Sequence, residues 1–146
     1  MAIALKDPPA VASASGAHGA EWRGSIRLVI LGQPVSMKNR RELVWHKGAG
    51  RPMLIKSKKA LAYAATVAMQ VPVREPLLTG KLKLTALLVY ESERPDLDDA
   101  LILDCLEKRI YVNDRQIRER HIYHATDKHN PRAEVVIEPL QAELLL

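Results

Sequence analysis

The sequence has little cysteine, few aromatic residues and no long apolar run. Its single cysteine, Cys105, excludes an internal disulfide and a cysteine-based zinc site, and it fits a reducing compartment. Two tryptophans, four tyrosines and no phenylalanine predict an aliphatic core and argue against an extended stacking platform for single-stranded bases. No stretch approaches the roughly 18 apolar residues that a membrane helix needs. We therefore expect a cytoplasmic protein that does not bind membranes.

Common catalytic motifs are missing as well. The run GAG at residues 48–50 lacks the lysine and serine spacing of a phosphate-binding loop, and no G-x-S-x-G motif marks a nucleophilic hydrolase. His121 and His124 form an H-x-x-H pair, but on a strand this spacing sends the two side chains to opposite faces, which argues against a shared zinc ion. We expect no small-molecule cofactor.

The chain has the size of one domain. Its 146 residues are 47% hydrophobic, which is enough for an ordinary core. Residues 1–24 are rich in Ala, Ser, Gly and Pro and predict a flexible N-terminal tail, because Lys6 and two prolines interrupt the apolar start too early for a signal peptide. We expect the folded domain at residues 25–140 and a C-terminal tail at 141–146.

Alternating apolar residues predict about five strands. We expect them at residues 25–35, 42–46, 80–92, 117–125 and 132–140. The segment 42–46 is expected to form a hairpin with 25–35. The clearest strand, 80–92, places five apolar residues on one face: Leu82, Leu84, Ala86, Leu88 and Tyr90.

Two helices are expected between these strands. The first begins after Ser57 as N-cap and ends before Pro72. Its predicted buried stripe consists of Leu61, Ala64, Ala65 and Ala68. The second runs from about residue 98 to 108, with Leu101, Ile102, Cys105 and Leu106 on one side. Helices on strand-to-strand connections predict an α+β or α/β domain with a mixed sheet, and of these we expect a single α+β domain.

Charge is distributed unevenly along a chain whose formal net charge is +5. Residues 38–59 hold eight basic side chains and one acid, whereas residues 91–114 hold eight acids and three basic residues. Separate basic and acidic blocks in one small domain predict a polyanionic partner and a bound cation, respectively. For the basic block, an unevenly charged solvated surface is the alternative.

The acidic block is densest in RPDLDD, residues 94–99. In an extended segment Asp96 and Asp98 lie on the same side, so both carboxylates can converge where the strand ends and the helix begins. Mg²⁺ binds one or two carboxylates together with waters and phosphate oxygens. If the helix extends back to Asp98, this residue faces the apolar side, where an unpaired carboxylate is costly. A helix N-cap at Asp98 or Asp99 is the alternative.

A third candidate carboxylate belongs to Asp114 in the motif YVNDRQI. It lies on a turn after the second helix, where the chain can double back toward Asp96. The neighbouring Arg115 offers a contact to phosphate. An ordinary turn residue is the alternative for Asp114, because the pair Asn-Asp is common in turns.

These motifs together resemble the RusA family of Holliday-junction resolvases. RPDLDD, a short helix and VNDRQI resemble the family's two acidic motifs, and GQPVSMKNRREL resembles its N-terminal strand and basic loop, over roughly residues 25–138. The resemblance implies a homodimeric, Mg²⁺-dependent endonuclease, common in phages and prophages, that cuts branched DNA in recombination and repair, with Mn²⁺ as a substitute ion. It implies three catalytic, metal-binding carboxylates, namely Asp96, Asp98 and Asp114. The implied DNA-binding residues are Lys38, Arg40, Arg41, Lys56, Lys58, Lys59 and Arg115.

Two positions depart from the family pattern. Asp99 stands where members usually carry Asn, and Ile102 stands where they place a catalytic lysine. A lysine would contribute positive charge in the transition state, so its absence should slow cleavage. A junction- or DNA-binding protein of the same fold, with weak or no cleavage, is therefore the alternative function.

Overall fold

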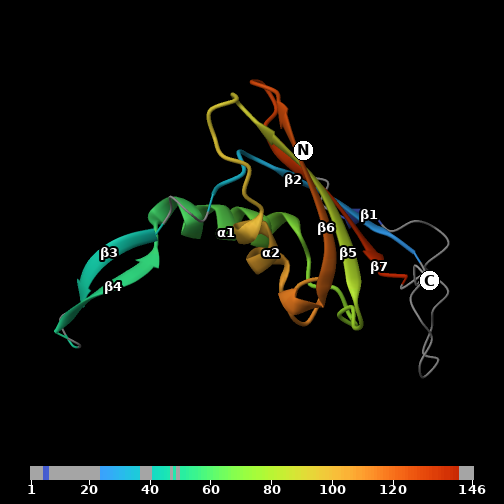
Figure 1. Cartoon of the computed structure of the whole chain (residues 1–146), viewed down its shortest axis with the longest axis horizontal. Coiled ribbons are helices and arrows are strands. Elements are labelled where there is room, and N and C mark those ends of the chain that lie inside the picture. The colour runs from blue at the N-terminus through green and yellow to red at the C-terminus, as the bar shows by residue number, and fades with distance from the viewer. Residues whose placement is uncertain (1–4, 7–23, 37–40, 47, 49, 142–146) are drawn as a thin grey trace, which may run out of the picture.

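The computed structural model describes residues 5–6, 24–36, 41–46, 48 and 50–141, with the backbone alone at 5–6, 41–44, 46 and 52–56. Figure 1 shows a sheet, two helices against one of its faces, and a hairpin at a distance from the sheet. The expected tails fall mostly outside the described residues. Within the N-terminal one, strand β1 (Leu5–Lys6) pairs with β2.

Five strands form the main sheet in the order β1-β2-β7-β5-β6. The four long strands are β2 (Ile26–Leu31), β5 (Leu82–Tyr90), β6 (Ile117–Thr126) and β7 (Arg132–Pro139). All neighbours are antiparallel except β5 and β6, which are parallel. A parallel pair requires a crossover connection, which here contains helix α2. The mixed sheet with two helices confirms the α+β fold.

The core lies between the sheet and the helices. The expected face of β5 is buried, with each of its five alternating residues at most 1% exposed. Ile26, Leu28 and Ile30 of β2 and alternate residues of β7 continue this face across the sheet. Because the side chains of a strand alternate between its two faces, the residues between them point to the opposite face.

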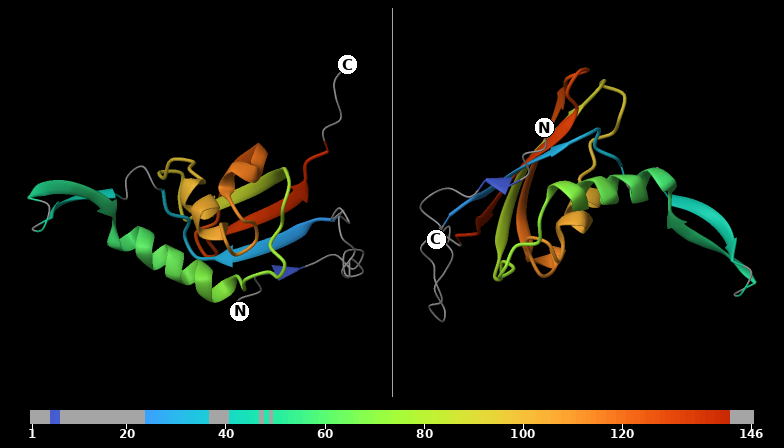
Figure 2. Two further views of the ribbon diagram at one scale, coloured as in Figure 1. Left: turned by 90° about the horizontal axis from the view of Figure 1, so that it is seen from below. Right: turned by 180° about the vertical axis from the view of Figure 1, so that it is seen from behind.

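The hairpin of β3 (Arg41–His46) and β4 (Arg51–Lys56) forms a separate two-stranded sheet. The expected pairing of 42–46 with 25–35 is therefore wrong. A short connection ending at Gly50, which has a φ of 61°, joins the two strands locally. β2 meanwhile pairs with β1 and β7. Figure 2 shows the hairpin extending from the N-terminal end of α1, away from the main sheet.

Helix α1 (Lys58–Gln70) begins where the sequence predicts, with the Ser57 Oγ accepting a hydrogen bond from the Ala60 N–H at 3.3 Å. The expected buried stripe of Leu61, Ala64, Ala65 and Ala68 is wrong. The helix instead buries Ala60, Tyr63 and Val67, and Leu61 is 56% exposed. Apolar residues occur on nearly every side of this helix, so the pattern alone does not select the buried side. The helix turns toward the sheet the side with Tyr63 and Val67, which buries more apolar area than the alanine-rich side would.

Helix α2 (Ala100–Leu106) is shorter than expected and ends before Lys108, which has a φ of 64°. It buries Leu101, Ile102, Leu103 and Leu106, while Cys105 is partly buried against the core. No helix in the described part of the chain is both long enough and apolar enough to span a membrane.

Candidate active site at the two ends of helix α2

Asp98 is buried just before α2, with 8% of its surface exposed. Its Oδ2 accepts a hydrogen bond from the Ser36 Oγ at 2.8 Å, and its Oδ1 accepts one from the Ala100 N–H at 3.0 Å. Ser36 lies in the segment after β2, so its hydrogen bond to Asp98 connects two distant parts of the sequence. Hydrogen bonds to both oxygens stabilise the carboxylate as an anion. Asp98 therefore lies on the buried side although α2 begins only at Ala100, and it also binds the first free N–H of the helix.

Asp99 and Asp96 lie on either side of Asp98. The backbone of Asp99 occupies the N-cap position of α2, but its side chain makes no capping hydrogen bond. Its Oδ2 lies 3.5 Å from the Nε of Arg120 on β6. Asp96 is exposed, and its backbone carbonyl accepts a hydrogen bond from the Tyr90 hydroxyl at 3.2 Å.

Tyr90, the last residue of β5, lies at the centre of this group. Its side chain is fully buried, and burial is the main reason why its pKa is above the ordinary value. A hydrogen bond with the Asp98 backbone lowers the pKa, whereas the charges of Asp98, Asp99 and Asp96 raise it. The hydroxyl contacts the Asp96 backbone, and Asp98 and Asp99 follow in the same segment at the start of α2. We call Asp96, Asp98 and Asp99 the N-terminal acidic group, because they lie at the N-terminal end of α2.

The motif VNDRQI forms a turn that is held at both ends by Gln116. Its Oε1 accepts hydrogen bonds from the Val112 and Asn113 N–H groups at 2.9 and 2.8 Å. Its Nε2 donates to the Leu78 and Gly80 carbonyls at 3.0 and 2.9 Å, just before β5. Gln116 therefore has a structural role in the motif, which is to fix the turn against the sheet.

Asp114 begins the short 3₁₀ helix η2 (Asp114–Gln116), which Asn113 caps. Its carboxylate is exposed, and its N–H donates to the Glu107 Oε1 at 3.2 Å. The pKa of the neighbouring Tyr111 is raised, mainly because its hydroxyl is buried. The charges of Asp114, Glu107 and Asp104 raise it further. Asp114 contacts Glu107, which directly follows the last residue of α2. We call Asp104, Glu107 and Asp114 the C-terminal acidic group, because they gather at the C-terminal end of this helix.

The structure brings Asp96 and Asp98 to one end of α2 and places Asp114 beside Glu107 at the other. Among the described residues, no three His, Cys, Asp or Glu side chains are arranged to hold a metal ion together. Hydrated Mg²⁺ needs only one or two protein carboxylates, and Asp96 and Asp98 supply the hard oxygen donors that it prefers. The N-terminal acidic group therefore has enough carboxylates for hydrated Mg²⁺ without a contribution from Asp114.

The predicted DNA-binding residues that the structure describes lie on the β3–β4 hairpin, on α1 and on η2. Lys58 and Lys59 are exposed in the first turn of α1, and Arg115 is exposed on η2. Arg41 and Lys56 are paired at the open end of the hairpin, next to the start of α1. Two further candidates, Lys38 and Arg40, lie outside the described residues.

The two histidines of the H-x-x-H pair lie on opposite faces of β6, as expected. His124 stacks on the Tyr90 ring with 4.9 Å between the centroids, on the face that α2 covers. The His121 Nε2 lies 2.8 Å from the Glu119 Oε1 on the other face. His124 therefore lies beside the N-terminal acidic group, and His121 does not.

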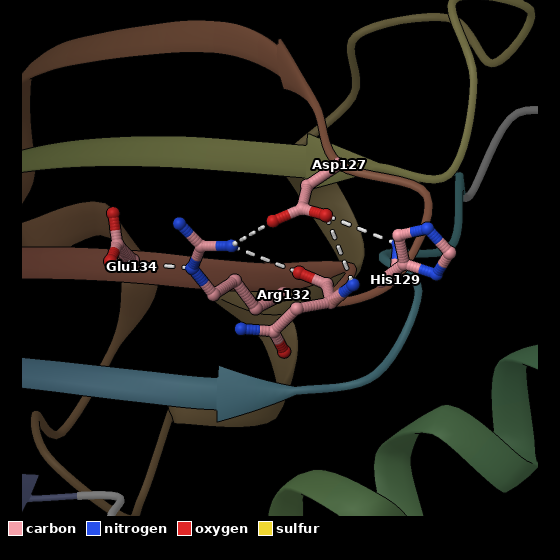
Figure 3. A network of polar contacts seen from close by, with 5 residues as sticks. Asp127, His129, Arg132 and Glu134 are labelled. Atoms are coloured by element: carbon pink, nitrogen blue, oxygen red, sulfur yellow. Dashed lines mark hydrogen bonds and ion pairs between the residues drawn. The ribbon is translucent and has the colours of Figure 1, made fainter.

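A polar network fixes the turn between β6 and β7 (Figure 3). The Asp127 Oδ1 accepts a hydrogen bond from the His129 N–H, and its Oδ2 lies 3.3 Å from the Arg132 Nη1. The Arg132 Nε in turn lies 3.4 Å from the Glu134 Oε1. The Asp127 N–H donates to the Tyr90 carbonyl at 2.8 Å. This network therefore supports the end of β5 that carries Tyr90.

The family model described as Endodeoxyribonuclease RusA matches residues 32–138. The chain belongs to the RusA family. No curated protein matches it significantly. The part that matches the RusA model begins after β2 and includes both acidic groups and almost all of β7. Membership indicates endodeoxyribonuclease activity and confirms the resemblance to Holliday-junction resolvases.

Three residues at this RusA site were not predicted from the sequence to act there. Ser36 lies in GQPVSM with no pattern pointing to Asp98, and Tyr90 was assigned only to the face of a strand. Arg120 lies on a strand predicted only as part of the sheet. Alternation along β6 offers a signal for Arg120, because it shares a face with Ile122 and His124.

Proposed function

We propose that this RusA protein is a homodimeric, Mg²⁺-dependent endonuclease that cleaves branched DNA, such as Holliday junctions, in recombination and repair. The observation that best supports the proposal is the buried Asp98 carboxylate, with hydrogen bonds to both oxygens, next to Asp96 and within the segment that matches the family. We propose that Asp96 and Asp98 hold the ion at the start of α2, and that Asp114, beside Glu107 at the other end of this helix, is the third catalytic carboxylate. When bound, Mg²⁺ polarises the phosphate and lowers the pKa of a water molecule.

The residues around Asp98 orient its carboxylate. The Ser36 hydroxyl and the Ala100 N–H each donate a hydrogen bond to one oxygen, which fixes the plane of the carboxylate. Carboxylate ligands that accept hydrogen bonds from neighbouring groups keep their orientation when the substrate arrives. Asp96, in contrast, is exposed and accessible to DNA.

The start of α1 suits the DNA backbone. Lys58 and Lys59 lie in its first turn, which contains no acid. Positive side chains at a helix N-terminus are unfavourable unless an anion binds there, because the helix dipole places partial positive charge at the same point. A phosphate would satisfy both the dipole and the lysines. Cutting two opposed strands at a branch also requires two sites related by a two-fold axis, which a C₂ dimer provides.

The proposal is tested with a synthetic mobile four-way junction and a linear duplex that contains one of its arms. We expect paired, symmetric nicks in the junction with Mg²⁺ or Mn²⁺, none with EDTA, and little cutting of the duplex under any condition. Equal cutting of both substrates would contradict structure selectivity. Cutting that persists in EDTA would contradict the metal-dependent mechanism.

The alternative is a junction-binding protein that cleaves weakly or not at all. It is favoured by Ile102, which is 1% exposed and packs in the core, so that this position places no cation in the site. A shift of the junction in a native gel, stronger than that of the duplex and without nicks in either metal, would support this alternative.

Replacing Lys56, Lys58 and Lys59 with Ala is expected to weaken junction binding. The dependence of log K on log salt should also become shallower by about one unit per lost phosphate contact. A matched variant with Arg27, Lys81 and Lys128 replaced by Ala removes the same charge from other exposed positions. Titrations at several salt concentrations give both slopes, and equal slopes for the two variants would mean that these lysines face solvent.

A further inference from the structure

We infer that Arg120 of β6 is the cationic residue of the active site and contacts the phosphate group that is cleaved. This inference rests on the proposed function, and it adds a residue that neither acidic motif contains. It follows from the direction of the Arg120 side chain, from its loose pairing with Asp99, and from the excess of negative charge around Tyr90.

The strand register directs Arg120 toward the acidic residues. Arg120 pairs with Leu84 of β5, whose side chain is buried under the helices. Paired residues of neighbouring strands point to the same face, so Arg120 also points toward α2. Its Nε lies 3.5 Å from the Asp99 Oδ2, at the start of that helix.

The contact between Arg120 and Asp99 leaves most of the guanidinium group available. The distance fits an ion pair, but the buried Asp99 Oδ2 accepts no hydrogen bond from the described residues. The Arg120 side chain is 52% exposed, so it remains open to DNA. A guanidinium has five N–H donors in a planar fork that matches two oxygens of a phosphate. Arg120 can therefore bind a phosphate without leaving the site.

The charges at the site require such a residue. A phosphate that approaches Asp96 and Asp98 meets three carboxylates, and cleavage adds negative charge to its oxygens. A fixed cation at this point offsets the repulsion and favours the transition state. Ile102 of α2 cannot do so, because it is an apolar core residue. Arg120 supplies the charge from the adjacent strand.

The experiment compares Arg120→Ala, Arg120→Lys and Asp99→Asn with Arg27→Ala. Arg27 is an exposed arginine of β2 between two buried residues, so it points away from the helices. Binding of the four-way junction is measured in EDTA at several salt concentrations, where cleavage does not contribute. Single-turnover cleavage is then measured in Mg²⁺ at saturating protein, and urea unfolding reports the stability of each variant.

We expect Arg120→Ala to make the salt dependence shallower by about one unit and to slow cleavage about a hundredfold. Arg120→Lys keeps the charge but loses the planar set of N–H donors, so its cleavage rate should lie between those of Arg120→Ala and wild type. Arg27→Ala should resemble wild type. Asp99→Asn should bind the junction as tightly as wild type or more tightly, because it removes a negative charge and leaves Arg120 in place.

The outcomes separate this inference from the proposed function. If Asp99→Asn reproduces the shallower salt dependence of Arg120→Ala in EDTA, Arg120 acts only as a structural partner of Asp99 and the inference is overturned. If Arg120→Ala cuts and binds like Arg27→Ala, the inference fails while the nuclease function stands. If the wild type binds junctions without cutting them, the proposed function fails, and the salt slope alone decides whether Arg120 touches phosphate. A wild type that binds no DNA overturns both.

Discussion

An Asp98→Asn variant is expected to bind a four-way junction as tightly as wild type and to cleave it at least about a thousandfold more slowly. The amide keeps an oxygen for the Ala100 N–H, and its NH₂ group can donate to the Ser36 oxygen, so the local fold should persist. The negative charge that attracts a divalent cation is lost. Single-turnover cleavage in Mg²⁺ and a native-gel titration in EDTA measure the two effects separately.

Glu93→Gln is a matched control for Asp98→Asn. Glu93 is exposed in the same loop, so this change removes an equal charge nearby without affecting a buried carboxylate. It should cut at nearly the wild-type rate. Unchanged cleavage by Asp98→Asn would remove Asp98 from the mechanism, and a large loss in urea unfolding would assign it to folding instead.

Asp114→Asn is expected to abolish detectable cutting and to leave junction binding largely intact. No hydrogen bond among the described residues uses the Asp114 carboxylate, so the amide should not disturb the turn that Asn113 and Gln116 hold. Cleavage assays over a range of Mg²⁺ and Mn²⁺ concentrations measure the loss. They also show whether a higher metal concentration restores activity, as expected for a weakened metal ligand.

Glu107→Gln provides the comparison for Asp114→Asn, because Glu107 belongs to the same acidic group and its amide can still accept the Asp114 N–H. This variant should keep cutting. If Asp114→Asn also cuts at the wild-type rate, Asp96 and Asp98 form the metal site without it. If it loses junction binding together with cutting, Asp114 has a structural role in the turn.

Regular patterns in the sequence were sufficient to predict strand β5. In β5, apolar residues alternate over the whole strand, and the predicted face is the buried one. The start of α1 was also predicted, because Ser57 is a strong N-cap immediately before a helical run. Both signals are local, so they do not depend on which other segments pack against them.

Predictions that required knowledge of distant partners were less successful. The stripe containing Leu61 and Ala64 and the one containing Tyr63 and Val67 have the same helical spacing, and only the packed sheet selects between them. The partner of residues 42–46 was missed because β2 pairs with β7, more than a hundred residues later, and leaves the hairpin to close on itself.

The candidate site shows the same limit. Asp96, Asp98 and Asp114 were predicted from their motifs and from the resemblance to the RusA family, and their role stays a prediction. The contact of Ser36 with Asp98 joins residues 62 positions apart, and that of Arg120 with Asp99 depends on the parallel register of β5 and β6. Alternation along β6 indicates the face of Arg120, but no pattern within either segment indicates its partner Asp99 or the contact of Ser36 with Asp98.

The hairpin of β3 and β4 has a further consequence for how this protein can diverge. It pairs with no strand of the main sheet, so its length is not constrained by the core. Residues 82–126, in contrast, carry both acidic groups and Arg120 on one continuous unit whose spacing is set by the strand register. We therefore expect insertions in the hairpin to leave the core and both acidic groups in place.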